Sequence, residues 1–201
     1  MLTKLSFLKK FLLFVAFAST VSYLQAQDNQ KGSETFGVSF YLNDFATASR
    51  IRTTSLNTVI ANKTFSRVGE MSAGLAVNYT KQMRPNMGFA ASLGISSMRY
   101  PMTGRVINKS SSLLEFSAAL NFMMTTDEYY VQPYLTLGVG GHKYGPHFGA
   151  FLPAGLGLKL NVFNEANLFI TTNYRVPVTN ETANYHFQHM IGVAAPIGKK
   201  K

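Results

Sequence analysis

Residues 71–79 read MSAGLAVNY and residues 87–96 read MGFAASLGIS, and these two stretches decide the fold. In both, a large apolar residue tends to occupy every second position, and small residues fill many of the positions between. Side chains of a β-strand alternate between its two faces, so a period of two indicates strands with one apolar and one small face. The pattern recurs and predicts eight strands, near residues 36–42, 71–79, 87–95, 114–122, 131–139, 150–160, 168–174 and 187–197.

The composition places these strands in a membrane. Only 14% of the residues are charged, whereas a surface in contact with water carries about 25–35%. After residue 26 the sequence contains no run of 18 apolar residues without charges, as a transmembrane helix would need. Because backbone groups in lipid must pair within the protein, a closed barrel is the other structure that can span a bilayer. We therefore predict an all-β fold, an eight-stranded antiparallel up-and-down transmembrane β-barrel.

A soluble up-and-down barrel, such as a lipocalin, is the main alternative. It would place its apolar face inside and a charged face in water. The second face of these strands is instead made of Gly, Ala, Ser, Asn and Thr with very few charges. Small residues suit the narrow interior of an eight-stranded barrel, so the large aliphatic face is expected to meet lipid.

The connections between the strands indicate the orientation of the barrel. Turn-forming residues make tight gaps near residues 84–86, 125–128 and 164–165. The connections after the first, third, fifth and seventh strands are longer on average, as external loops of outer-membrane barrels are. The first of them, residues 43–69, is the longest, and Leu56 to Ala61 within it are expected to form a short helix or strand extension.

The first 26 residues have the pattern of a signal peptide. Lys4, Lys9 and Lys10 precede a short apolar core at residues 11–18, and Ala26 is a plausible cleavage position. An uncleaved anchor helix is the alternative, but the apolar core is short for a membrane span. We expect residues 1–26 to be removed and residues 27–201 to form the barrel domain.

Three charged residues fall on the inward face of their strands: Glu115, Lys159 and Arg175. Charges inside a narrow lumen need partners. We therefore predict a salt-bridge network that plugs or gates the lumen, with Glu115 and Arg175 near the external end and Lys159 deeper. The alternative is that each charge meets water or a neutral neighbour separately.

The four histidines raise the question of catalysis. Some small outer-membrane barrels are lipid A deacylases or acyltransferases that combine His with Ser and a carboxylate, held within hydrogen-bond reach. His142, His147, His186 and His189 show no such alignment in the sequence, and His142 and His147 lack a metal-ligand spacing. The sequence contains no cysteine and no phosphate-binding loop. We expect no catalytic, cofactor-binding or metal-binding residues and no enzyme activity.

The expected external loops are basic. They carry Arg50, Arg52, Lys63, Arg67, Arg105 and Lys109, and the formal net charge of the chain is +10. A basic balance can indicate nucleic acid or an anionic membrane surface. The export signal favours anionic lipid headgroups, so we expect no nucleic-acid partner.

Four runs carry a resemblance to a known family: LNDF at 42–45, RIRTT at 50–54, FGAF at 148–151 and YRVPVT at 174–179. With them the chain resembles the N-terminal barrel of OmpA-family proteins over essentially the whole mature length. Many family members add a C-terminal domain that binds peptidoglycan, and this chain is expected to be a barrel-only member.

The resemblance implies a location and several roles. It places the protein in the outer membrane of a Gram-negative bacterium, surrounded by outer-membrane lipid and inserted by the barrel assembly machinery. Family barrels suggest a non-enzymatic structural, envelope-integrity or surface-interaction role, with a possible external partner on the 43–69 loop. A lipid-modifying enzyme and a narrow passive pore are the two alternatives, because a fold by itself does not fix a function.

Overall fold

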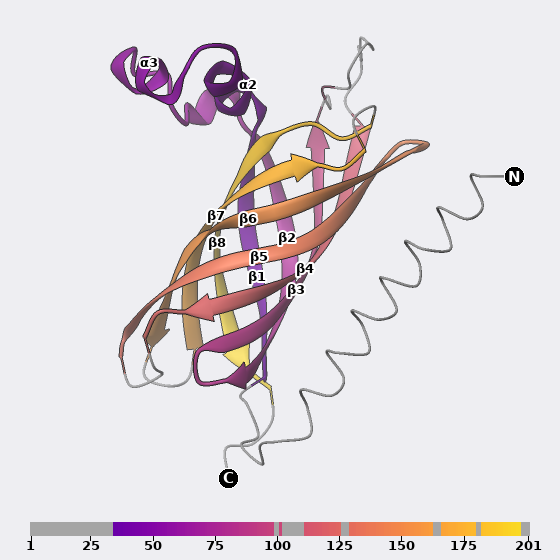
Figure 1. The fold of residues 1–201 in the computed structure, drawn as a ribbon. Helices are drawn as coiled ribbons and strands as arrows, with labels where there is room; N and C mark the ends of the chain where they lie inside the picture. Colours follow the sequence, from indigo (N-terminus) through magenta and orange to yellow (C-terminus); the bar gives the residue numbers. More distant parts are fainter. Residues whose placement is uncertain are drawn as a thin grey trace, which may run out of the picture. The chain divides into compact units, whose positions relative to one another are not determined.

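The described residues form one closed antiparallel barrel. The computed structural model describes residues 34–98, 101, 111–125, 129–162, 166–179 and 182–197, so the expected signal peptide, Arg105 and Lys109 lie outside it. Each strand pairs with the next along the chain, and the last pairs with the first (Figure 1). The strands are β1 Glu34–Asp44, β2 Ser72–Arg84, β3 Met87–Met98, β4 Ser111–Met123, β5 Val131–Tyr144, β6 His147–Val162, β7 Ala166–Pro177 and β8 His186–Pro196. The predicted eight-stranded up-and-down barrel is confirmed.

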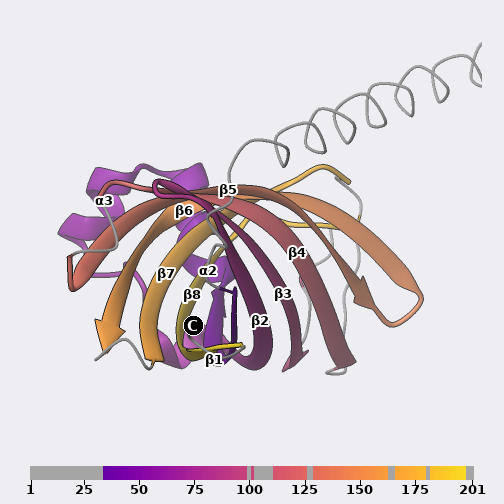
Figure 2. The same ribbon diagram turned by 90° about the horizontal axis from the view of Figure 1, so that it is seen from below.

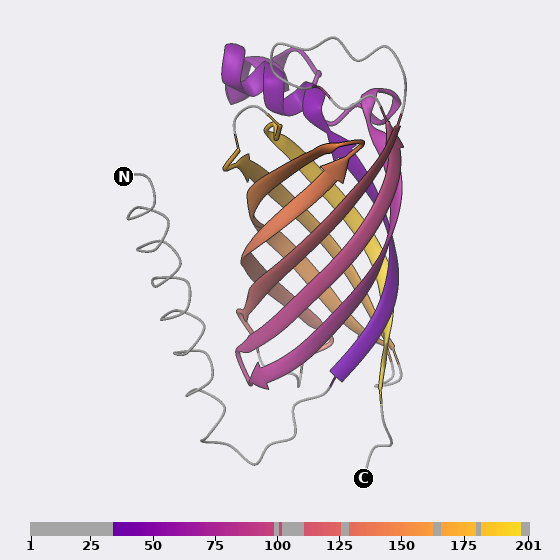
Figure 3. The same cartoon turned by 90° about the vertical axis from the view of Figure 1, so that its right-hand side faces the viewer.

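Short helices lie at one end of the barrel, which we call the helix end; the opposite end, where β1 begins and β8 ends, is the terminal end (Figures 1 and 3). Helix α2, Phe45–Thr53, starts directly after β1 because Asp44 caps it: the N–H of Thr47 donates to Asp44 Oδ1 at 2.8 Å. Helix α3, Leu56–Ala61, is the helical alternative expected there, and the 3₁₀ turn Val68–Glu70 follows. No helix among the described residues is long and apolar enough to cross a bilayer.

The predicted length of one connection is wrong. The connection between β5 and β6, grouped above with the longer loops, is a turn of two residues, 145–146. Gly145 takes a φ of +55°, which a glycine adopts without strain, and so reverses the chain tightly. Both strands therefore continue past the point where the sequence pattern fades at Gly140 and Gly141, and their register holds from Val131 to Tyr144.

Large apolar side chains cover the outer wall. Val38 is 62% exposed and Leu137 is 59% exposed, and similar residues on all eight strands share this face. Soluble monomers rarely expose contiguous apolar patches beyond a few hundred Å². A continuous belt of this kind fits the acyl chains of a bilayer, and the protein is a transmembrane barrel.

The inner wall combines aromatic rings with glycines. A Cβ on Gly74 would lie 2.3 Å from the ring of Tyr41, and a Cβ on Gly157 would lie 2.2 Å from the ring of Tyr134. Each ring therefore occupies the space that a side chain on the neighbouring strand would need. The strands curve around one lumen (Figure 2). In so narrow a lumen, these large inward rings fit because the neighbouring strand carries a glycine beside each of them.

Adding a methyl group at Gly157 should destabilise the barrel. The ring of Tyr134 cannot swing away easily, because its hydroxyl is hydrogen-bonded to Thr171 on β7. We expect Gly157→Ala to lower the free energy of unfolding by about 1–3 kcal/mol, measured by circular dichroism in urea on the protein in detergent micelles. Gly69→Ala is the control, because nothing lies within 4 Å of its Cβ position. Equal stability of the two variants would contradict this packing.

Candidate functional site

The candidate site is the part of the lumen nearest the helix end, where Glu115 and Arg175 meet. Glu115 lies on β4 and Arg175 on β7, and the Nη1 of Arg175 donates to Oε1 of Glu115. Both side chains are only 3% exposed. Since β4 and β7 are not neighbours in the barrel, the ion pair crosses the lumen.

Two amides complete this charged centre. Nη2 of Arg175 donates to Oε1 of Gln188 at 2.7 Å, and Nδ2 of Asn43 donates to Oε2 of Glu115 at 3.2 Å. These bonds bring β1 and β8 into the same cluster. A buried ion pair is stable only when the remaining donors and acceptors also find partners. Sequence reasoning missed Asn43 and Gln188, although both lie on the inward phase of their strands.

An aromatic layer covers the ion pair on the helix side. The guanidinium of Arg175 lies 4.3 Å from the ring centroid of Phe151, and Nε2 of His186 lies 4.0 Å from Oε1 of Glu115. Phe45, the first residue of α2, stacks on His186 with the ring centroids 4.2 Å apart. Phe45 also packs against a buried apolar cluster of Met98, Leu113 and Tyr144. An ion pair, an aromatic layer and the first residue of α2 therefore occupy the lumen at the helix end.

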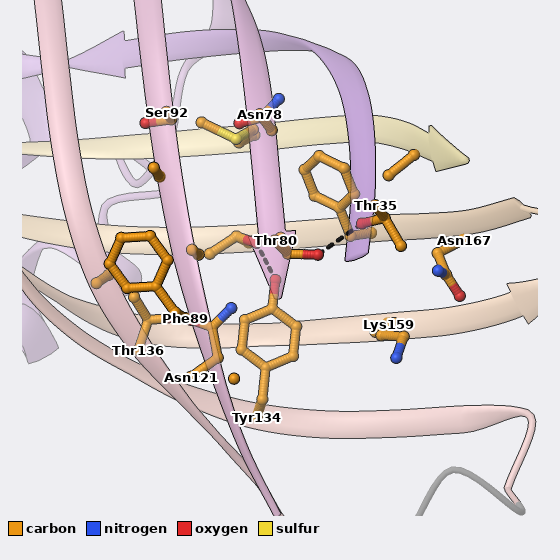
Figure 4. A pocket seen from close by; sticks show the side chains of 18 of the residues that line it. Thr35, Asn78, Thr80, Phe89, Ser92, Asn121, Tyr134, Thr136, Lys159 and Asn167 are labelled. Atoms are coloured by element: carbon orange, nitrogen blue, oxygen red, sulfur yellow. Dashed lines mark hydrogen bonds between the residues drawn. The ribbon is translucent and has the colours of Figure 1, made fainter. Parts of the chain in front are cut away.

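Lys159 lies elsewhere. It lines a cavity of about 110 Å³ in the half of the lumen nearest the terminal end (Figure 4). Thr35, Asn167 and Ala194, which lie near strand ends there, line the same cavity, and neither Glu115 nor Arg175 does. The structure thus brings together two of the three residues of the predicted network and separates the third. The alternation of inward and outward residues gives the face of each residue, but the height along the barrel depends on the stagger between strands.

The histidines divide between the two walls. His142 and His186 point into the lumen and are buried, whereas His189 lies on the outer wall of β8. Nε2 of His189 is 3.2 Å from Oγ of Ser66, and its Nδ1 is 3.1 Å from Oγ1 of Thr172. Sequence reasoning missed this contact because 123 residues separate Ser66 from His189. Among the described residues no group of three or more His, Cys, Asp or Glu is placed to hold a metal ion.

Comparison with known proteins identifies the fold. No protein-family model and no curated protein sequence matches the chain. Among solved structures, Ail, the attachment invasion locus protein of Yersinia pestis, matches with a TM-score of 0.52 and 12% identity over 84% of this chain and 100% of that chain. The outer membrane protein OprG of Pseudomonas aeruginosa matches with a TM-score of 0.52 and 11% identity over 82% and 93%. The chain therefore has the fold of outer-membrane barrels, and the expected likeness to OmpA-type barrels holds at the level of fold.

Removing one partner of the buried pair should be costly. Glu115→Gln leaves the guanidinium of Arg175 buried without a counter-charge, and we expect it to lower the free energy of unfolding by about 3–5 kcal/mol. Urea titration of the protein in detergent micelles measures the change.

The double variant is the control for this prediction. Combining Glu115→Gln with Arg175→Met removes both charges, so it should be more stable than Glu115→Gln alone. If the single variant were as stable as the original protein, Glu115 and Arg175 would not be energetically coupled.

Proposed function

We propose that this protein is a non-conducting outer-membrane barrel that acts through its lipid-facing wall and its external loops. One observation carries the proposal: near the helix end the buried Glu115–Arg175 pair crosses the lumen, and Phe45 of α2 packs against a buried apolar cluster there. The fold shared with Ail and OprG supports an outer-membrane location. We further infer export through residues 1–26, insertion by the barrel assembly machinery, and an orientation with the helix end outside the cell.

The geometry argues against a narrow passive pore. A conducting lumen needs a continuous water path, and here the cavity of the terminal half ends at a salt-bridged layer. Asn43 and Gln188 hold this layer from two further strands. A structural or surface-interaction role in the envelope is therefore favoured over transport.

The 43–69 loop is the surface best suited to a partner. It carries four basic side chains, Arg50, Arg52, Lys63 and Arg67, and one acidic one, Asp44. Contacts fix two of them: Arg50 Nη2 lies 2.6 Å from Oε2 of Glu70, and the guanidinium of Arg52 lies 3.7 Å from the ring centroid of Tyr185. Basic side chains that are already held in place lose less conformational entropy on binding a polyanion than basic side chains on a disordered loop would.

The expected partner is an anionic saccharide carrying phosphate or sulfate groups. Ail has been solved in complex with the heparin analogue sucrose octasulfate. The shared fold alone does not transfer that binding, but the basic loop of this chain provides the matching charge. Such groups occur on the sugars of surface glycolipids and of host glycans.

Bilayer recording tests the closed lumen. We expect the refolded protein to add no conductance to a planar bilayer, because no continuous water path crosses the Arg175 layer. The combined change Phe45→Ala and Arg175→Ala removes two of the layers and should produce conductance. Phe65→Ala on the outer wall is the control and should add no conductance. Conductance by the original protein would overturn the proposal.

Binding of sucrose octasulfate tests the loop. Lys63→Gln should weaken binding by about two- to fivefold at low salt, as for one exposed ion pair, measured by isothermal titration calorimetry in detergent micelles. The effect should shrink at high salt because exposed charges are screened. Lys81→Gln, which removes the same charge near the terminal end where Lys81 pairs with Glu34, is the control. A loop partner of another chemistry is indicated if the two variants bind equally.

A further inference from the structure

A serine and a histidine meet on the outer wall at the helix end. The segment after α3 folds back onto β8 and places Oγ of Ser66 3.2 Å from Nε2 of His189. On the far side of the imidazole, Nδ1 lies 3.1 Å from Oγ1 of Thr172, which is the cross-strand neighbour of His189. A hydroxyl, an imidazole and an orienting group therefore follow one another in hydrogen-bond contact.

The order of these groups matches what an activated serine needs. If Nδ1 carries the ring proton, it donates to Thr172 Oγ1, and Nε2 is then free to accept the proton of Ser66. A nucleophilic hydroxyl requires such a base, itself oriented by a third group. Here a threonine hydroxyl takes the place that a carboxylate takes in many serine hydrolases.

The backbone at Ser66 is held in an uncommon conformation. Its φ is +49°, in the left-handed region that a residue other than glycine seldom adopts. The N–H of Ser66 donates to Oγ1 of Thr47 at 3.0 Å, and Thr47 is fully buried in the first turn of α2. Strained residues of this kind persist where the surroundings fix them, and they concentrate at functional sites.

The position on the wall indicates the substrate. On β8 the apolar belt runs through Val193 and Ile191, which is 48% exposed, and the next outward residue is His189. On β7 the belt runs through Ile170 to Thr172. Ser66 and His189 therefore lie at the helix-end edge of the aliphatic belt, beside the aromatic rings of Phe187 and Tyr174. Aromatic side chains of outer-membrane barrels gather where the acyl chains meet the headgroups.

Neighbouring side chains complete a surface for a lipid. Phe65 and Phe187 lie beside the pair with their ring centroids 6.2 Å apart, and Phe65 is 42% exposed. Arg67 follows Ser66; its side chain is 50% exposed, and its Nη1 lies 3.8 Å from Oε1 of Glu70. Exposed aromatic rings beside a partly exposed arginine suit an acyl chain with an anionic headgroup.

We propose that Ser66 and His189 form a catalytic dyad that cleaves an acyl ester bond of a membrane lipid. Ser66 Oγ attacks the ester carbonyl while His189 Nε2 takes its proton. The carbon–oxygen bond to the lipid alcohol then breaks, and the imidazolium gives its proton to that alcohol. Water, deprotonated by the same nitrogen, attacks the acyl-serine, which releases the fatty acid and returns the proton to Ser66. Thr172 is a positioning residue for the imidazole.

If the Ser66–His189 hydrogen bond has only a structural role, the expected reactivity of Ser66 is different. If the hydrogen bond only fastened the loop to the wall, Ser66 would be no more reactive than any other exposed serine. Ser49 is a matched reference, because it lies exposed in α2 of the same loop. Reactivity toward an electrophile separates the two roles without knowledge of the natural substrate.

The first experiment treats the folded full chain in detergent micelles with a fluorophosphonate probe, and mass spectrometry locates the modified serine. We expect modification at Ser66, no modification of Ser66→Ala, an unchanged rate for Ser49→Ala, and a rate at least 100-fold lower for His189→Gln. Thr172→Val should slow modification about tenfold and Thr172→Ser should restore it. Different migration of boiled and unboiled samples on a gel shows that each variant is folded. If Ser66 is unmodified in the folded protein, or is modified equally in His189→Gln, the dyad is wrong.

The second experiment identifies the source of the ester. The protein is incubated separately with phosphatidylglycerol vesicles and with lipopolysaccharide, and released fatty acid is quantified. Release that Ser66→Ala abolishes supports the proposal, and the lipid that yields it is the substrate class. Absence of release from both lipids overturns the assignment as a lipid esterase. Neither result depends on whether the lumen conducts, so this inference and the proposed function fail separately.

Discussion

The whole structure depends on one constraint, which is that each backbone N–H and C=O in a bilayer must find its partner within the protein. The pairing of β1 with β8 satisfies it, because without that pairing two strand edges would face lipid. Closure with only eight strands also fixes a narrow lumen. Large side chains can therefore cover the outer wall freely, whereas on the inner wall a ring such as that of Tyr41 takes the space beside a glycine of the next strand, here Gly74.

The narrow lumen in turn determines how charge can be kept inside. Glu115 and Arg175 are cut off from bulk water, so each is stable only through the other and through the amides of Asn43 and Gln188. The same contacts join four strands across the barrel, which makes the charged centre a structural element. A lumen occupied in this way leaves the outer wall and the loops as the surfaces where the protein can meet other molecules.

The first loop connects the interior with those outer surfaces. Asp44 ends β1 and caps α2, so the helix starts at the mouth of the barrel and places Phe45 in the lumen. Thr47, in the same first turn, holds the backbone of Ser66, which contacts His189 on the outside. One short helix thus packs against the buried groups at the mouth of the barrel and supports a polar contact at the border of the lipid-facing belt.

The number of strands, their antiparallel order, the residues that face lipid and the inward position of Glu115, Lys159 and Arg175 could all be predicted from the sequence pattern. A period of two carries this information locally, because neighbouring side chains in a strand must point to opposite faces. Only the tertiary structure decided which inward residues meet. Strand direction already indicated that Glu115 and Arg175 lie toward one end and Lys159 deeper. The stagger between strands sets the exact height of each side chain, and it brought Glu115 into contact with Arg175 while Lys159 lines the cavity in the other half of the lumen. The path of the long loop is likewise absent from any local pattern, and the contact between Ser66 and His189 exists only because that loop folds back over the finished wall.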